Sequence, residues 1–215
     1  MSESPLRAWN DWLRRLRRGA PVVVVSGLPR SGTSMLMNML AAGGLELLSD
    51  GARAADEDNP RGYFELERVM ALADERDHSW LRDARGKGVK IISHLLKHLP
   101  RENDYRVILV ARALPEVIAS QNRMLSNRGE HNPVDDQATA DLYAKHLLAV
   151  RGWLSLQANC RLLNVHYRAA VAEPHKVAAE LAQFVGAGLD AARMAAAVDT
   201  RLYRNRADSS AAGAA

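Results

Sequence analysis

Short apolar runs alternate along the chain with longer segments whose apolar residues recur at helical spacing. Residues 22–25 (VVVV) and 105–111 (YRVILVA) are the strongest runs, as expected for strands covered on both faces of a parallel sheet. Weaker strand candidates are residues 45–48, 89–92 and 162–165. Helical patterns lie between them, at residues 33–42, 65–77, 115–127, 137–158, 174–185 and 190–198. This alternation predicts an α/β fold, a single three-layer domain with a mostly parallel central sheet flanked by helices.

The two ends of the chain have patterns of their own. Residues 5–18 place two tryptophans and two leucines at helical spacing, with arginines on the other face, which predicts an amphipathic helix. We interpret this helix as packed on the edge of a domain that spans residues 1–206; a helix on a membrane surface is the alternative. Residues 207–215 (ADSSAAGAA) are small and polar, and we expect them to form a disordered tail.

Composition excludes several classes of protein. The 215 residues are 47% hydrophobic and 25% charged, as in ordinary soluble globular proteins, and the single Cys160 excludes an intramolecular disulfide. No apolar run approaches the roughly 20 residues of a membrane helix, and the N-terminus lacks the apolar core of a signal peptide. We therefore expect a cytoplasmic protein with no transmembrane segment.

The charge pattern argues against a nucleic-acid partner. The net charge is only +4, and 5% of the residues are aromatic, whereas nucleic-acid binders usually combine a basic stripe with aromatic side chains. A single focused pocket for an anion is still compatible with this charge.

The first chemical motif follows the first predicted strand, where Gly27-Leu28-Pro29-Arg30-Ser31-Gly32-Thr33-Ser34 leads directly into a helix. Two glycines five residues apart allow a tight turn and a close approach of the backbone to a ligand. Successive amide groups and the helix N-terminus then form an anion site, to which Thr33 and Ser34 add hydroxyl donors.

The same loop differs from the phosphate loop of nucleotide triphosphatases, G-x-x-x-x-G-K-[ST]. Both glycines match, but Thr33 occupies the position of the lysine that reaches the β- and γ-phosphates. The positive charge here is Arg30, inside the loop. The loop therefore predicts an anion site that is not designed for a triphosphate, although a P-loop kinase of small molecules stays as the alternative.

The second motif follows the YRVILVA run. Arg112 comes directly after this predicted strand, at its carboxyl edge, where a guanidinium group can bind a phosphate through two hydrogen bonds. Ser120 lies in the following helix, a turn and a half beyond Pro115, and is positioned to turn back toward the same edge. The alternative is an arginine held in a salt bridge and a serine that faces solvent.

Together these motifs resemble those of the sulfotransferases that use 3′-phosphoadenosine 5′-phosphosulfate (PAPS). P-R-S-G-T-S after a strand resembles their 5′-phosphosulfate loop, P-[KR]-[ST]-G-T-[TS], and the spacing of Arg112, Pro115 and Ser120 matches their 3′-phosphate motif. Residues 59–65 (NPRGYFE) resemble a stretch common in bacterial members. The resemblance implies that PAPS is the co-substrate and PAP the product, and that Arg30 assists the bridging oxygen. The implied cofactor-binding residues are Gly27, Pro29, Arg30, Ser31, Gly32, Thr33, Ser34, Arg112 and Ser120.

Transfer of a sulfuryl group to a hydroxyl or amine also needs a base, and the resemblance leaves three candidates. They are Glu65, which we favour, Asp50, directly after the second predicted strand, and His94, after the third. The sequence around His94 departs from the K-T-H-x-P pattern of the cytosolic enzymes. Seven histidines form no H-E-x-x-H or similar ligand pair, so we expect no metal site.

The sequence leaves the acceptor open among small molecules, carbohydrates and lipids, and a homo-oligomer is possible. Besides the kinase, the alternative function is a non-catalytic module of the same fold that binds PAP or another anion.

Overall fold

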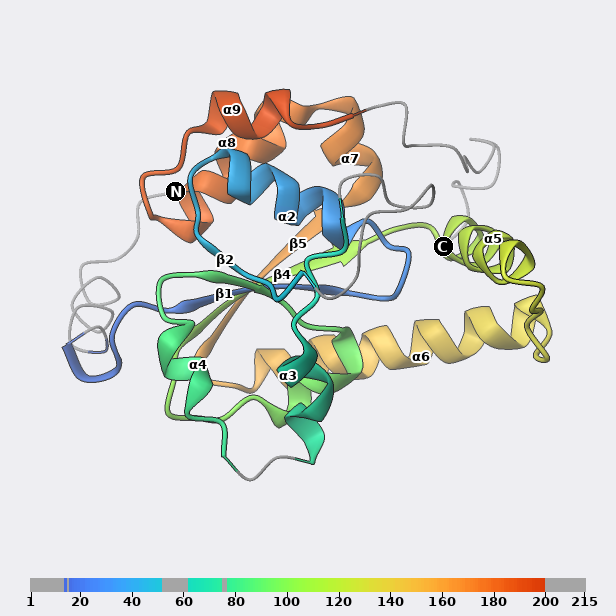
Figure 1. Cartoon of the computed structure of the whole chain (residues 1–215), viewed down its shortest axis with the longest axis horizontal. Coiled ribbons are helices and arrows are strands. Elements are labelled where there is room, and N and C mark those ends of the chain that lie inside the picture. The colour runs from blue at the N-terminus through green and yellow to red at the C-terminus, as the bar shows by residue number, and fades with distance from the viewer. Residues whose placement is uncertain (1–13, 15, 52–61, 75–76, 200–215) are drawn as a thin grey trace.

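A five-stranded parallel sheet forms the centre of the computed structural model, which describes residue 14 and residues 16–51, 62–74 and 77–199 (Figure 1). The strand order is β2-β3-β1-β4-β5, and every neighbouring pair is parallel. The strands are β1 (Val22–Gly27), β2 (Leu47–Leu48), β3 (Gly88–Lys90), β4 (Tyr105–Ala111) and β5 (Cys160–His166).

Helices connect successive strands, as parallel pairing requires. The α-helices among the described residues are α2 (Thr33–Ala42), α3 (Glu67–Met70), α4 (Trp80–Asp83), α5 (Leu114–Asn127), α6 (Asp136–Ser155), α7 (Tyr167–Ala172), α8 (Pro174–Val185) and α9 (Ala191–Ala196). Two 3₁₀ helices, η1 (Ala71–Ala73) and η2 (Ser93–His98), complete the connections. None of the helices in the described part of the chain is long and apolar enough to cross a membrane.

Alternate side chains of β1 enter two separate cores. Val23 and Val25 pack on the face covered by α2, α7, α8 and α9, whereas Val22 and Val24 pack on the face covered by α3, α4, η2 and α6. Figure 1 shows these helices in two layers above and below the sheet. The two-sided burial confirms the three-layer α/β fold expected from the continuous apolar runs.

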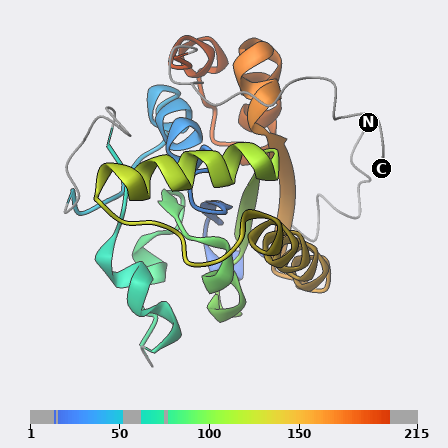
Figure 2. The same ribbon diagram turned by 90° about the vertical axis from the view of Figure 1, so that its right-hand side faces the viewer.

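The carboxyl ends of β1 and β4 meet at one edge of the sheet. β1 is paired with β4 along its whole length, with Gly27 opposite Val110, so the segments that follow the two strands begin side by side. Figure 2 looks at this edge and shows α5 lying across it. The two motifs are thereby brought together, as expected for ligand sites in open parallel sheets.

Three predicted elements have the expected limits, whereas the longest predicted helix, at 137–158, ends earlier, because α6 is Asp136–Ser155. The helices at 33–42 and 174–185 and the strand at 105–111 have the predicted limits. The helix expected at 65–77 is shorter, because α3 ends at Met70 and is followed by η1. The ring nitrogen Nε2 of His78 lies 3.0 Å from the carbonyl oxygen of Leu72, so a side chain interacts with a carbonyl that a continuing helix would use. Three short helices, α4, η2 and α7, were not predicted.

The predictions for the termini fall largely outside the described residues. Residues 14 and 16–18, at the end of the expected N-terminal helix, are helical. The rest of that helix and the expected tail at 207–215 lie among residues that the structure does not describe.

Candidate functional site

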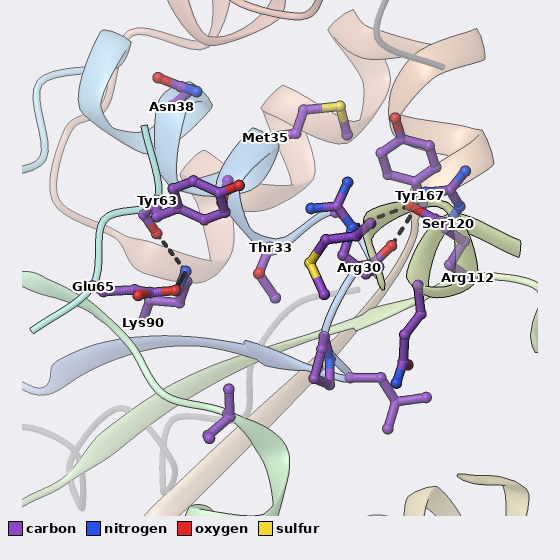
Figure 3. A pocket seen from close by; sticks show the side chains of 18 of the residues that line it. Arg30, Thr33, Met35, Asn38, Tyr63, Glu65, Lys90, Arg112, Ser120 and Tyr167 are labelled. Atoms are coloured by element: carbon purple, nitrogen blue, oxygen red, sulfur yellow. Dashed lines mark hydrogen bonds and ion pairs between the residues drawn. The ribbon is translucent and has the colours of Figure 1, made fainter. Parts of the chain in front are cut away.

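A cavity of about 580 Å³ opens at the carboxyl edge of the sheet, within the size range of ligand pockets. Both sequence motifs line it, together with residues from β3, α5 and the segment before α3 (Figure 3). Its charged lining residues, among those described, are five cationic side chains and two acidic ones: Arg30, Lys90, Arg112, Arg123, Arg128, Glu65 and Asp199.

The loop between β1 and α2 is compact because glycines occupy its two crowded positions. A Cβ atom at Gly27 would lie 2.5 Å from Ser31 Oγ and 3.0 Å from the Val110 carbonyl oxygen. Gly32 has a φ of 102°, and a Cβ there would lie 2.2 Å from Cδ2 of Tyr167. Ser31 is buried inside the loop, whereas Thr33 and Ser34 line the cavity. The N-terminus of α2, where helices bind anions, thus forms part of the cavity wall.

Direct hydrogen bonds join the two motifs. Arg30 Nε donates to Ser120 Oγ at 3.1 Å, and Arg112 Nη1 donates to the carbonyl oxygen of Arg30 at 3.2 Å. Arg30 itself has a left-handed backbone, with a φ of 66°, which is unfavourable for a residue with a side chain. The bonds to its carbonyl and to its guanidinium group therefore help to hold the loop in this shape.

Arg112 is fixed on several sides. Its side chain is 8% exposed, and Nε donates to Glu116 Oε2 at 2.9 Å. The ring of Tyr167 lies against the same group, with its centroid 4.6 Å from Cζ. Arg112 is thus both in a salt bridge, as the alternative interpretation expected, and part of the cavity wall. Burial raises the pKa of Tyr167, so its hydroxyl group stays protonated and can donate a hydrogen bond near neutral pH.

A second polar cluster lies around Lys90, on β3. Lys90 Nζ donates to the carbonyl oxygen of Tyr63 and lies 3.4 Å from Glu65 Oε1. Lys90 is 10% exposed and Glu65 is 43% exposed, so the carboxylate is the more accessible member of this ion pair. Figure 3 shows Glu65 and Lys90 side by side, separated from the arginine cluster by Thr33.

Of the three candidate bases, Glu65 lines the cavity and the other two do not. Asp50 Oδ2 accepts a hydrogen bond of 2.5 Å from the backbone N–H of Glu67, at the start of α3. His94 is an exposed residue of η2. All the implied cofactor-binding residues line the cavity except Ser31.

The sequence interpretation missed Lys90, Tyr167, Arg123 and Arg128 as residues of the site. Lys90 is the last residue of β3 and Tyr167 directly follows β5, so the strand-end rule that selected Arg112 also applies to them. Arg123 and Arg128 had no comparable signal, because polar residues are common on the exposed face of a helix. Within the described residues, no group of three His, Cys, Asp or Glu side chains is arranged to hold a metal ion.

Comparisons with known proteins agree with this architecture. The family model described as "Sulfotransferase domain" matches residues 20–210. The solved sulfotransferase domain of the Synechococcus PCC 7002 olefin synthase is 21% identical, with a TM-score of 0.52 over 80% of this chain and 75% of that one. A sulfotransferase domain from the curacin biosynthetic pathway is 16% identical, with a TM-score of 0.51 over 86% of this chain and 89% of that one. The curated proteins include no match to the chain. At these identities the two solved structures show a shared fold.

We expect Gly32→Ala to destabilise the protein more than Gly44→Ala. Both glycines have a φ near 100°, so the strained backbone of an alanine lowers the free energy of unfolding by a similar amount, about 1–2 kcal/mol, at either position. Only the Gly32 substitution also forces a methyl group into the ring of Tyr167, since nothing lies within 4 Å of a Cβ at Gly44. Overpacking of this kind adds about 1–3 kcal/mol to the loss in free energy of unfolding. Urea unfolding of the two variants measures the difference; equal losses would contradict the described packing of Tyr167 on the loop.

Proposed function

The chain belongs to the sulfotransferase domain family, and we propose that it is an enzyme that transfers the sulfuryl group of PAPS to a hydroxyl or amine acceptor. The observation that carries this proposal is that Arg30 and Arg112 line one cavity and are joined by a hydrogen bond between them. The family match and the fold of the two solved sulfotransferase domains support it.

The residues present fit a doubly phosphorylated nucleotide. Gly27 and Gly32 occupy positions where a larger side chain would clash, and they keep the loop compact next to the N-terminus of α2. This helix N-terminus suits the 5′-phosphosulfate group. Arg112 and Ser120 would hold the 3′-phosphate, as the strand-end arginine can bind phosphate oxygens through its fork of donors. The bound co-substrate would supply an activated sulfuryl group.

Arg30 and Glu65 have separate roles in this proposal. Arg30 stabilises the negative charge on the phosphate oxygen from which the sulfuryl group departs, and it does so electrostatically because arginine stays protonated. Glu65 takes the proton from the attacking acceptor, since it is the candidate base that lines the cavity and is accessible there. Lys90 lies against Glu65 and orients its carboxylate.

A P-loop kinase requires a lysine where this chain has Thr33. The loop between β1 and α2 contains no lysine. A sulfotransferase is the better fit because the positive charge of the loop comes from Arg30, which contacts the second motif directly.

Calorimetric titration with PAP and with ATP, at matched salt, tests the proposal. We expect PAP to bind tightly and ATP to show no measurable binding, because the site has donors for a 3′-phosphate and lacks the lysine for a γ-phosphate. Tight ATP binding without PAP binding would favour the kinase instead. Binding of PAP without sulfuryl transfer to any member of a broad acceptor panel would favour the non-catalytic module.

Two substitutions separate the roles of the charged residues. We expect Arg30→Ala to lower kcat by about 10²–10³-fold, the usual effect of losing one group that stabilises developing charge, with a much smaller loss of PAP affinity. Glu65→Gln should also lower kcat at unchanged PAP affinity, because the amide cannot accept the proton of the acceptor. Steady-state kinetics and PAP titrations measure both effects. Equal losses of kcat and PAP affinity in Arg30→Ala would contradict its role, and an unchanged kcat in Glu65→Gln would contradict the assignment of the base.

A further inference from the structure

Two of the five cationic side chains on the cavity wall are not used by the proposed function. Arg30 donates to Ser120, Lys90 pairs with Glu65, and Arg112 pairs with Glu116. Arg123 and Arg128 are exposed, and neither side chain has a hydrogen bond or an ion pair with another residue in the described part of the chain. They are therefore cationic groups at the cavity that are available to a ligand.

The position of Arg128 on α5 separates it from the 3′-phosphate motif. Ser120, Met124 and Arg128 follow one another at four-residue spacing, so they share a face of the helix, and this face lines the cavity. Arg128, the residue that caps the C-terminal end of α5, lies eight residues beyond Ser120, or about 12 Å along the axis at 1.5 Å per residue. A phosphate bound by Ser120 and Arg112 is thus too far along the helix to be the natural partner of Arg128.

The C-terminal end of α5, where Arg128 lies, is directed toward the proposed base. Figure 2 shows that α5 crosses the carboxyl edge of the sheet toward the side of β2 and α3. Met70, from α3, and Glu65 line the same cavity as Met124 and Arg128. The acceptor must approach Glu65 for its proton to be removed, so we place the acceptor in this part of the cavity.

The wall of this part is apolar as well as cationic. Met70 and Met124 contribute thioether side chains, and Ile92, which follows β3, adds a branched one. Methionine side chains adapt to irregular apolar ligands, whereas an arginine forms paired hydrogen bonds with carboxylate, phosphate or sulfate groups. A ligand that contacts both the methionine and the arginine side chains favourably has an apolar body and an anionic group.

Resting on the proposed function, we propose that the acceptor is an amphiphilic alcohol that already carries an anionic group, which Arg123 and Arg128 bind while its hydroxyl lies at Glu65. The two arginines then select the acceptor and fix its orientation, and they take no part in the chemistry of transfer. Their effect should appear in acceptor affinity and KM, and for Arg128 the affinity for PAP should stay unchanged.

Four alcohols of one chain length test this inference. They are ω-hydroxyoctanoate, its methyl ester, ω-hydroxyoctyl phosphate and ω-hydroxyoctyl sulfate, titrated calorimetrically into the complex of the protein with PAP. We expect at least one of the anionic alcohols to bind about tenfold more tightly than the neutral ester, as charge-assisted hydrogen bonds provide. Comparison of the three anions identifies which group the arginines prefer.

Three variants complete the test. Arg123→Ala and Arg128→Ala should each reduce the preference for the anion severalfold, and Arg128→Ala should leave the affinities for PAP and for the ester unchanged. Arg82→Ala is the matched control, because Arg82 is an exposed arginine on helix α4 that does not line the cavity. It should change none of these affinities.

The possible failures are distinguishable. Equal binding of the ester and the anions, no measurable binding of any anion, or equal losses in Arg82→Ala and Arg128→Ala would overturn this inference while the PAP titration still supports a sulfotransferase. Failure of the wild-type protein to bind PAP would overturn the proposed function, and this inference with it.

Discussion

The hydrogen bond from Arg112 to the carbonyl oxygen of Arg30 connects segments 82 residues apart in the sequence, and the geometry of the site depends on it. Arg30 has a left-handed backbone that a residue with a side chain adopts at a cost, so its carbonyl needs a fixed partner. Arg112 provides that partner because Glu116 and the ring of Tyr167 hold its guanidinium group in place. The shape of the loop and the position of the second cationic group are therefore coupled.

The parallel pairing of β1 with β4 makes this bond possible. Their register places Gly27 opposite Val110, so the loop after β1 and Arg112 after β4 begin next to each other at the carboxyl edge of the sheet. The helices on both faces bury all of β1 and most of β4, and the resulting rigidity supports a site whose groups must stay within hydrogen-bonding distance. Because one fold supports many activities, the assignment depends on these residues together with the family match.

The sequence was sufficient for the fold and for the motifs, because both are local signals. Long apolar runs and helical periodicity identified β4, α2 and α8 with their limits, whereas α4 and α7 are too short to show a period. The strand-end rule located Arg112 but does not say where a side chain points, and the family resemblance left Asp50 and His94 beside Glu65 as candidate bases. The pairing of Lys90 with Glu65 and the packing of Tyr167 on Gly32 join distant segments, so they required the tertiary structure.

The central claim is that Arg30 and Arg112 bind the two ends of one nucleotide. The most direct test compares the affinities of PAP and of adenosine 5′-monophosphate for the wild-type protein and for Arg112→Gln, a substitution that keeps a hydrogen-bond donor near Glu116. The account predicts that the wild-type protein prefers PAP about tenfold or more, as a charge-assisted contact to the 3′-phosphate provides, and that the substitution removes this preference because it weakens PAP binding more than binding of the monophosphate. Equal weakening of both ligands would contradict it, because Arg112 would then act only by supporting the loop.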